Sequence, residues 1–252
     1  MNTCIEGKWF ENWFNSPYYH ILYNKRDDKE AELFIDNLLH FLKPPKNASF
    51  LDLACGKGRH SVYLNKKGYS VTGIDLSPES IAFAEQFTND QLQFYIQDMR
   101  KPFRINYFNY VLNLFTSFGY FDHNKDDIAA LTAAQKALKP EGIIVLDFMN
   151  VQKVIAELPR HEVQIKKGIT FNIYKSIENN FIIKRILFSD KGKDYAFEER
   201  VKALTLADFE KYFAASYLKI VHLLGNYELD YFNPESSERL IIIAEKNKPI
   251  TI

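Results

Sequence analysis

The sequence predicts an α/β protein with a Rossmann-like, doubly wound, mostly parallel seven-stranded sheet that carries an antiparallel β insertion. Two observations lead to this prediction. From residue 47 to about residue 159, short apolar runs alternate with amphipathic segments at helical spacing, which is typical of parallel strands covered by helices. From residue 160 to 203, four strand-like runs follow one another with only turn residues between them, which indicates an antiparallel meander.

Residues 1–46 are expected to form a helical cover at the N-terminus. Apolar residues recur every three to four positions over residues 27–42, and Pro44 and Pro45 then end the helical pattern. Beyond residue 47, Ser77 is a suitable N-cap and Pro78 a suitable first residue for a helix. The remaining elements expected in this half are strands at 48–53, 69–75, 92–96, 107–114 and 142–148, and helices at 59–67 and 125–138.

The inserted segment is expected to be a lid of four strands. Its turns are predicted at Lys167-Gly168, Asn179-Asn180 and Lys191-Gly192, because Gly and Asn accept the left-handed backbone of tight hairpins. The strands lie at 162–166, 169–177, 181–189 and 195–204, and are followed by a helix at 206–215 and strands at 218–224 and 239–245. We therefore expect three parts, namely the N-terminal cover 1–46, the α/β core 47–159 with 204–252, and the lid 160–203.

Composition narrows the range of functions. The chain has 252 residues, with 32 basic and 32 acidic side chains, so no net charge attracts it to nucleic acid or to an anionic membrane. Cys4 and Cys55 make neither a disulfide framework nor a four-ligand zinc spacing, and we expect no metal site. We find no signal peptide and no uncharged apolar run of membrane-spanning length. These features favour a cytoplasmic protein, a monomer or a homodimer, that does not bind membranes.

The segment that carries chemistry follows the first predicted strand. That strand ends at Asp52 and turns through small residues and two glycines into a helix, so the backbone can approach a ligand closely. It is not a dinucleotide fingerprint, because Ala54 and Cys55 stand where the first glycine and its neighbour would be needed. An anionic side chain at this place favours a cationic ligand over a phosphate.

Acidic residues also end the next two predicted strands. Asp75 can accept both hydroxyls of a ribose, which is the role of an acidic residue about 20 positions after a glycine-rich turn. Asp98 can accept an exocyclic amine, and the thioether of Met99 can lie on a purine face. Three acidic strand ends at one edge of a parallel sheet indicate a nucleoside-containing cofactor. The segment 113–121 then mixes small polar and aromatic residues where a second substrate would meet that cofactor.

These segments resemble the class I S-adenosylmethionine-dependent methyltransferases, in the branch that modifies small molecules and carries an antiparallel cover. The resemblance lies in LDLACGKGRH from Leu51, VTGIDLSPE from Val71, QDM from Gln97, NLFTSFGYF from Asn113 and ALKPEGIIVLDF from Ala137. It continues through FEERVKALTLADFEKYF from Phe197 and ERLIIIAEK from Glu238, so that it covers most of the chain in the family's order.

The resemblance implies S-adenosyl-L-methionine as the cofactor, S-adenosyl-L-homocysteine as its product and a small-molecule acceptor. It places the first motif around the methionine part, Asp75 on the ribose, Asp98 on the adenine, and the backbone after the fourth strand beside the sulfonium. The substrate pocket would include Phe118 and Tyr120, and His123 is the candidate general base. The implied cofactor-binding residues are Tyr19, Tyr23, Arg26, Asp52, Ala54, Cys55, Gly56, Gly58, His60, Asp75, Leu76, Ser77, Asp98, Met99, Asn113, Leu114 and Phe115.

The function expected on these grounds is methyl transfer to a small or medium-sized acceptor by in-line displacement. The alternatives are a methyltransferase that acts on tRNA or protein, a protein that binds the cofactor without chemistry, and a NAD-dependent oxidoreductase. Balanced charge argues against RNA. The residues after the fourth strand read Asn113-Leu114-Phe115-Thr116, not the Asn/Asp-Pro-Pro-aromatic sequence of amino-modifying DNA methyltransferases.

Overall fold

The computed structural model describes residues 9–23 and 28–247 of the chain, and its main element is a seven-stranded sheet. The strand order is β10-β11-β5-β4-β1-β2-β3, in which β1 to β5 are mutually parallel and β11 runs antiparallel to both β5 and β10. The predicted fold class is confirmed. The strands are β1 (Ser49–Leu53), β2 (Ser70–Asp75), β3 (Leu92–Ile96), β4 (Phe108–Asn113), β5 (Leu138–Met149), β10 (Leu218–Leu224) and β11 (Arg239–Lys246).

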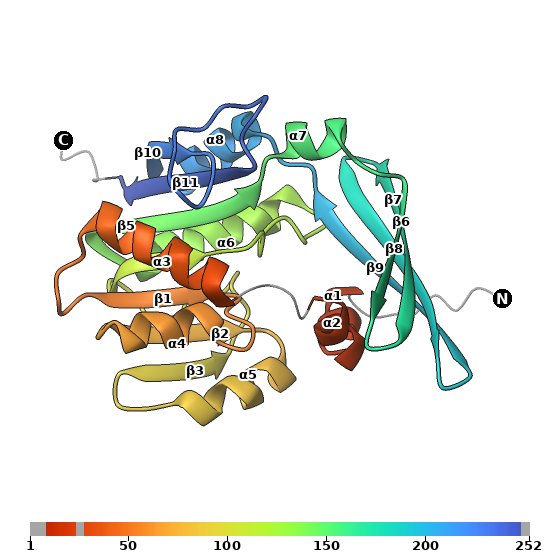
Figure 1. Ribbon diagram of the computed structural model, residues 1–252. Coiled ribbons are helices and arrows are strands. Elements are labelled where there is room, and N and C mark those ends of the chain that lie inside the picture. The colour runs from red at the N-terminus through yellow and green to blue at the C-terminus, as the bar shows by residue number, and fades with distance from the viewer. Residues whose placement is uncertain (1–8, 24–27, 248–252) are drawn as a thin grey trace.

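Helices cover both faces of this sheet (Figure 1). One face packs against α3 (Asp28–Leu42), α4 (Arg59–Lys66) and α5 (Pro78–Ala84), which a short 3-10 turn, η1 (Glu85–Phe87), follows. The other face packs against α6 (Asn124–Ala137) and α8 (Leu206–Ala215). The strands are therefore buried on both sides, which explains their near-continuous apolar sequences. No helix in the described ranges is long and apolar enough to cross a membrane.

A second, antiparallel sheet of four strands stands beside the main sheet, at the right of Figure 1. Its strands are β6 (His161–Lys166), β7 (Ile169–Glu178), β8 (Phe181–Asp190) and β9 (Lys193–Lys202), within the predicted insertion. Each of its hairpins has a two-residue loop with positive φ at both positions, as the mirror-image turns of tight hairpins require. All three predicted turns lie at these loops.

The N-terminal helices α1 (Trp9–Phe14) and α2 (Pro17–Leu22) pack on the inner face of the second sheet (Figure 1). Trp13 is fully buried there against an apolar cluster that includes Phe171 and Phe188. Its indole Nε1 donates a hydrogen bond of 2.6 Å to Glu199 on β9. Because a buried indole needs both apolar contacts and a partner for its N–H, this arrangement fixes α1 to the second sheet.

Two elements differ from the sequence prediction. β5 begins at Leu138, directly after α6, and not at residue 142. Lys139 precedes Pro140, and a residue before proline is held in extended backbone, so strand geometry starts as soon as the helix stops. The helix α7 (Val151–Ala156) was not predicted, because six residues are too few to show a helical period. Asn150 precedes it, and its side-chain amide donates 2.8 Å hydrogen bonds to the carbonyls of Pro234 and Ser237.

Candidate cofactor and acceptor site

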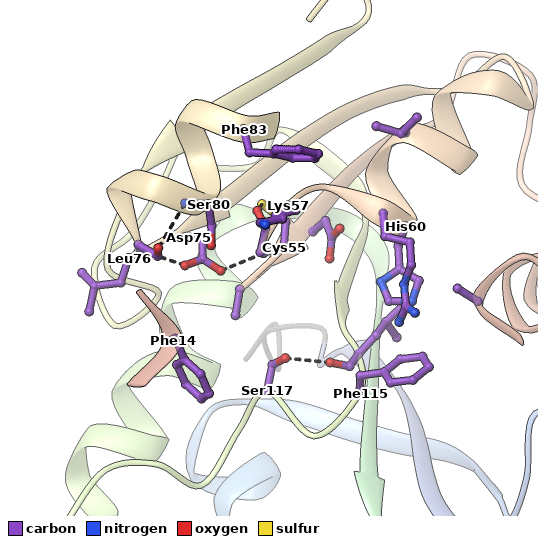
Figure 2. A pocket seen from close by; sticks show the side chains of 18 of the residues that line it. Phe14, Cys55, Lys57, His60, Asp75, Leu76, Ser80, Phe83, Phe115 and Ser117 are labelled. Atoms are coloured by element: carbon purple, nitrogen blue, oxygen red, sulfur yellow. Dashed lines mark hydrogen bonds between the residues drawn. The ribbon is translucent and has the colours of Figure 1, made fainter. Parts of the chain in front are cut away.

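A cavity of about 660 Å³ opens at the carboxyl ends of the parallel strands, next to α1 and α2. The order of the strands reverses between β1 and β4, and in doubly wound sheets such a switch point is where ligands bind. Figure 2 shows side chains converging on this space from β2, from the turn after β1, and from the loop after β4. Most of the residues proposed from the sequence line it: Tyr19, Tyr23, Asp52, Ala54, Cys55, Gly56, His60, Asp75, Leu76, Ser77, Asp98, Met99, Leu114, Phe115 and Tyr120.

The turn after β1 is built from three residues with left-handed backbone. Ala54, Gly56 and Gly58 have φ values of 56°, 55° and 80°. A Cβ on Gly56 would meet nothing within 4 Å, because this residue borders the cavity. A Cβ on Gly58 would lie 2.7 Å from Cζ of Phe94, so this glycine is needed for packing below the turn. The first glycine therefore leaves room for a ligand, and the second lets the turn lie close to β3.

Asp75 joins the turn to the end of β2. Its Oδ2 accepts a 2.8 Å hydrogen bond from the Gly56 N–H, and its Oδ1 accepts one of 2.8 Å from the Ser77 N–H. Burial raises the pKa of this carboxyl, and the backbone N–H donors partly offset that effect. Two carboxylate oxygens offer about four acceptor positions, so these backbone bonds leave acceptor capacity on the carboxylate for a ligand. This geometry suits a pair of vicinal ribose hydroxyls.

Asp52 lies deeper than Asp75, at the base of the cavity. The carboxyl is 1% exposed, and its Oδ2 accepts a 2.6 Å hydrogen bond from the Ser61 hydroxyl. Burial raises its pKa to about 7, with the nearby charge of Asp75 acting in the same direction. A cationic group in the cavity would favour the ionised form, because an opposite charge stabilises a carboxylate.

His60 borders the same cavity with a nitrogen that has no partner. Its Nε2 is buried and makes no hydrogen bond, and burial together with the positive charge of Arg59 lowers its pKa to about 3. The imidazole is therefore neutral, and it lies 5.2 Å from the ring of Phe115 (Figure 2). A buried polar atom without a partner costs free energy, and a polar ligand in the cavity can remove that cost.

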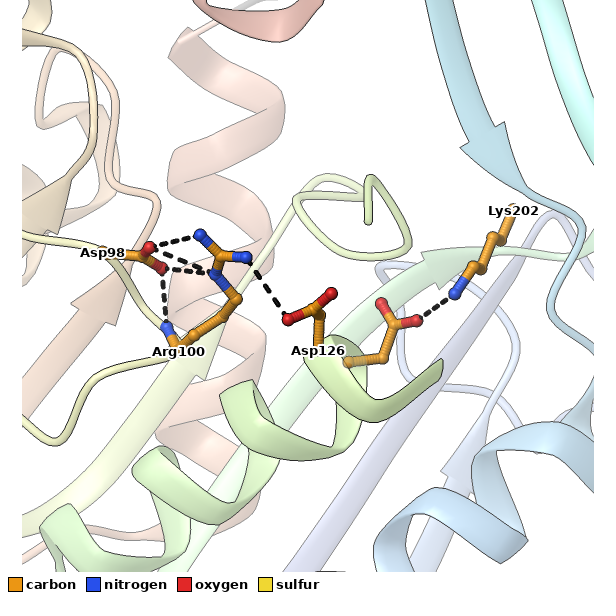
Figure 3. A network of polar contacts seen from close by, with 5 residues as sticks. Asp98, Arg100, Asp126 and Lys202 are labelled. Carbon is orange, nitrogen blue, oxygen red and sulfur yellow. Dashed lines mark hydrogen bonds and ion pairs between the residues drawn. The ribbon is translucent and has the colours of Figure 1, made fainter. Parts of the chain in front are cut away.

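Asp98 and Met99 line the side of the cavity nearest β3, but the Asp98 carboxylate is already paired. Arg100 contacts it through Nη2 at 2.6 Å and Nε at 3.0 Å, and also reaches Asp126 at 3.4 Å (Figure 3). The arginine thus ties the loop after β3 to the first turn of α6. A ligand amine would have to share Asp98 with this guanidinium.

The loop after β4 is held in place by the ion pair between Asp147 and Arg239. Phe115 and Thr116 both have left-handed backbone, with φ of 58° and 59°. The Phe115 N–H donates to Oδ2 of Asp147 at 2.8 Å, and Arg239 donates from Nη2 to the Thr116 hydroxyl at 2.9 Å. Asp147 is fully buried at the carboxyl end of β5 and also accepts a hydrogen bond from Tyr227.

Aromatic side chains from α1, α2 and the loop line the lid side of the cavity; we call Phe14, Tyr19, Tyr23 and Tyr120 the aromatic wall. The Phe14 ring lies 5.0 Å from Tyr19 and 5.6 Å from Tyr120, and Tyr19 lies 5.0 Å from Tyr23. The Tyr23 hydroxyl donates to Glu199 at 2.7 Å, and the Tyr120 hydroxyl donates to the Thr116 carbonyl at 2.6 Å. The faces of these aromatic rings attract cations, including sulfonium and alkylated ammonium groups.

Several predicted site residues do not line the cavity. Phe118 is 2% exposed and packs in the core against Phe209, so its placement in the substrate pocket was wrong. His123 is an exposed residue at the N-cap of α6, outside the cavity lining, and this position gives no support for its role as a base. The Asn113 side chain donates instead to the carbonyls of Leu53 and Ser117, both at 3.2 Å.

Three further residues were predicted to bind the cofactor, namely Gly58, Arg26 and Ser77. Gly58 has the packing role described above, and Arg26 lies outside the described residues. The serine of the second motif, Ser77, lines the cavity and is also the N-cap of α5, where its Oγ accepts a 3.1 Å hydrogen bond from Ser80. Ser77 also donates a hydrogen bond to the side chain of Asn15, which links α5 to the segment after α1.

Sequence reasoning missed the residues that act from behind the cavity or from distant segments. Phe14 was not proposed, because an aromatic residue in a short helix looks like ordinary packing. Asp147 could have been found, since it is a further acidic residue near the end of a parallel strand. No local signal marks Arg239, which approaches the loop through the pairing of β11 with β5, or Tyr227, which lies in the segment between β10 and β11.

Comparisons with known proteins agree with the fold and the site. Residues 51–146 match the family described as a methyltransferase domain. YqeM of Bacillus subtilis (strain 168) is 36% identical over 118 residues, which span 46% of this chain and 48% of YqeM. This chain therefore spans about half the length of that relative. The dTDP-3-amino-3,4,6-trideoxy-alpha-D-glucopyranose N,N-dimethyltransferase of Streptomyces venezuelae is 26% identical over 195 residues, 73% of this chain and 80% of the relative.

Solved structures give the same fold over nearly the whole chain. An S-adenosylmethionine-dependent methyltransferase from Clostridium acetobutylicum ATCC 824 superposes with a TM-score of 0.77 at 20% identity, covering 92% of this chain and 96% of that one. The cavity is consistent with S-adenosylmethionine: it has open space at Gly56, carboxylate oxygens on Asp75 and an unpartnered polar atom on His60. Residues 51–146 match a methyltransferase domain, and with its first-motif turn and its strand order the chain has the fold of the class I S-adenosylmethionine-dependent methyltransferases.

Proposed function

We propose that this protein transfers the methyl group of S-adenosylmethionine to an amino nitrogen of a small molecule. The observation that carries the proposal is the aromatic wall, which faces the acidic strand ends across one cavity. Cation–π attraction of roughly 0.5–2 kcal/mol favours a methylated ammonium product as well as the sulfonium of the cofactor. The relative from Streptomyces venezuelae is named as an amino-sugar N,N-dimethyltransferase, which supports a nitrogen acceptor.

Each part of the cavity has a proposed role toward the cofactor. Asp75 would accept the ribose hydroxyls, while Leu76 and Met99 would contact the adenine. Asp52 and His60 would lie toward the methionine part, with the backbone of the loop after β4 beside the sulfonium. The cofactor supplies an electrophilic methyl group, so the protein has to orient the acceptor nitrogen in line with it and keep water away. Orientation of this kind can lower a barrier by up to about 7–11 kcal/mol.

The rings of the aromatic wall would orient the amine, because the hydroxyl groups of Tyr23 and Tyr120 already have partners. Tyr120 donates its proton to the Thr116 carbonyl, and Tyr23 donates its proton to Glu199 and accepts a 3.2 Å hydrogen bond from Lys184. A nitrogen held in this way keeps its own lone pair free for attack on the methyl group, and proton loss can follow without a dedicated base.

The second sheet, with α1 and α2 packed on it, would form the lid, residues 160–203, that covers the cavity and selects the acceptor. It reaches the core through Lys202, whose ammonium contacts Asp127 at 2.5 Å in a buried pair (Figure 3). The same ammonium donates a 3.0 Å hydrogen bond to Asn124. We also propose a cytoplasmic location. A fractionation experiment on the native protein tests the location.

Incubation with methyl-labelled S-adenosylmethionine tests the reaction. Four acceptor pools are compared: nucleotide-linked amino sugars, free amino acids, RNA and unrelated proteins, each analysed by mass spectrometry. We expect label on an amino nitrogen in one of the first two pools. Label confined to RNA or protein would overturn the small-molecule proposal, and label on oxygen or carbon would overturn the nitrogen acceptor.

Two variants and two binding measurements separate the remaining alternatives. Tyr120→Phe keeps the ring but loses the hydroxyl, and we expect a raised KM for the acceptor with cofactor affinity unchanged. Tyr120→Leu removes the ring as well, and its turnover should fall further. Tight binding of S-adenosylhomocysteine without turnover of any pool would indicate a sensor, and binding of NAD in its place would indicate an oxidoreductase.

A further inference from the structure

The free edge of the second sheet exposes apolar side chains. Among the residues that the structure describes, β6 pairs with β7 alone, so its other side is an open strand edge there. Val163 is 52% exposed and Ile165 is 69% exposed, and both lie on the face of the sheet opposite α1 and α2. Proteins usually protect such an edge with proline, a bulge or charged side chains, because an open edge pairs readily with another strand.

The opposite edge of the same sheet is protected in this way. On β9, Glu198 forms an ion pair with Arg185 at 3.2 Å, and Arg200 lies within 3.7 Å of Asp122. The backbone of Lys202 also donates a hydrogen bond to the Gly119 carbonyl of the main domain. Charge and tertiary contacts thus cover β9. On β6 the exposed face carries Val163 and Ile165, and the charged residues Glu162 and Lys166 lie on the other face, where Glu162 pairs with Lys175 at 2.9 Å.

The hydrogen-bonding pattern of β6 allows a further strand to pair with its open edge. The Lys175 N–H donates to the Arg160 carbonyl at 2.9 Å, so residues 160 and 175 are a hydrogen-bonded pair. In an antiparallel ladder such pairs alternate, and the register therefore directs the peptide groups of residues 162, 164 and 166 toward β7. The peptide groups of residues 161, 163 and 165 point to the open edge.

A second copy of β6 meets these groups in one favourable register. For antiparallel pairing about a two-fold axis at Gln164, Val163 lies opposite Ile165 and Glu162 lies opposite Lys166, each twice. An axis at Glu162 or Lys166 would place like charges opposite each other, and so would an axis at residue 163, which sets Lys166 opposite Arg160. An axis at residue 165 would set neither Glu162 nor Lys166 opposite a charge of the other copy. Cross-strand pairs of opposite charge and of β-branched residues stabilise a ladder.

We propose that two copies of this chain form a homodimer by pairing their β6 edges about a two-fold axis at Gln164. The two four-stranded sheets then become one continuous antiparallel sheet, and the contact is isologous as two-fold symmetry requires. The exposed rings of Tyr174 and His161, which stack at 4.5 Å, lie on the same sheet at the border of this contact. This proposal does not depend on the methyl acceptor.

Single cysteines report the register directly, in a full-length Cys4→Ser background that keeps the buried Cys55. Gln164→Cys places two thiols opposite each other in a non-hydrogen-bonded pair, where Cα atoms are about 4.5 Å apart, and a disulfide can form. We expect a cross-linked dimer under mild oxidation for Gln164→Cys. Val163→Cys and Ile165→Cys should stay largely monomeric on a denaturing gel, because each lies opposite the other residue and not opposite itself.

Charge reversal tests the same contact in solution by sedimentation. Lys166→Glu should raise the dimer dissociation constant about tenfold, since it places Glu162 of each copy opposite a second carboxylate. Glu162→Lys with Lys166→Glu should restore the dimer, and Thr170→Lys, exposed on the neighbouring strand, should leave it unchanged. A monomeric wild-type protein at about 100 μM, equal cross-linking of all three cysteines, or a Lys166→Glu variant that dimerises like the wild type would overturn the proposal.

Discussion

Arg239 donates a 2.7 Å hydrogen bond from Nε to Oδ1 of Asp147, across the antiparallel pairing of β11 with β5. The Asp147 side chain is fully buried and that of Arg239 is 19% exposed. The pair also holds the loop after β4, through the Phe115 N–H and the Thr116 hydroxyl. Residues in left-handed backbone cost free energy and persist only where their surroundings hold them. The ion pair is therefore a structural support for the wall of the cofactor cavity.

Breaking this pair should destabilise the protein strongly. Arg239→Met leaves Asp147 as a buried charge without its cation, and we expect the free energy of unfolding to fall by about 3–5 kcal/mol in urea titrations. The matched control is Lys219→Met, which removes an exposed ion pair with Glu245 on neighbouring strands and should cost no more than about 1 kcal/mol. Similar losses in the two variants would contradict the supporting role.

The two glycines of the turn after β1 should respond differently to alanine. Gly58→Ala forces a Cβ against Phe94 and imposes left-handed backbone on alanine, so the variant should lose about 2 kcal/mol of stability or more. Gly56→Ala meets open space and should cost only about 1–2 kcal/mol from the backbone, but it narrows the cavity. Thermal melting with and without S-adenosylhomocysteine distinguishes the two variants. The ligand should raise the melting temperature of Gly58→Ala as much as that of the wild type, and that of Gly56→Ala less.

Asp75→Ala should weaken the binding of S-adenosylhomocysteine by about 1.5–3 kcal/mol, since it removes a charge-assisted contact with the ribose. It also removes the acceptor for the Gly56 and Ser77 N–H groups, so the loss should reach the upper part of this range. Isothermal titration calorimetry measures the effect, with Glu79→Ala on the exposed first turn of α5 as the control. Unchanged affinity in Asp75→Ala would place the ribose elsewhere.

His60 should make the ligand-free protein sensitive to acid. Its pKa is about 3 in the folded protein and near its ordinary 6.5 in the unfolded chain, so the unfolded chain binds one more proton between these values. The free energy of unfolding should therefore fall as pH drops below 6.5, by up to about 1.4 kcal/mol per pH unit from this residue. Urea titrations from pH 7 to pH 4.5 should show a shallower decline for His60→Gln, and an identical decline would refute this origin.

Much of the site follows from local sequence. Asp52, Asp75 and Asp98 could be placed together because acidic residues end successive parallel strands, whose carboxyl ends meet at one edge of the sheet. The two-residue hairpin loops of the second sheet were also predictable, since Lys167-Gly168 and its counterparts are turns by residue type alone. Phe118 was misplaced for the opposite reason: an aromatic residue in a loop gives no local sign of which way its ring points.

Local sequence is enough to predict the kind of fold, the class of cofactor and the acidic edge of the sheet, because periodicity, turn chemistry and glycine spacing act over a few residues. Tertiary structure alone decided that Arg239 and Tyr227 support the loop after β4, that Arg100 occupies Asp98, and that His60 keeps an unpartnered nitrogen in the cavity. Those relationships join residues distant in the chain or depend on burial, and burial is set only when the sheets and helices have packed together.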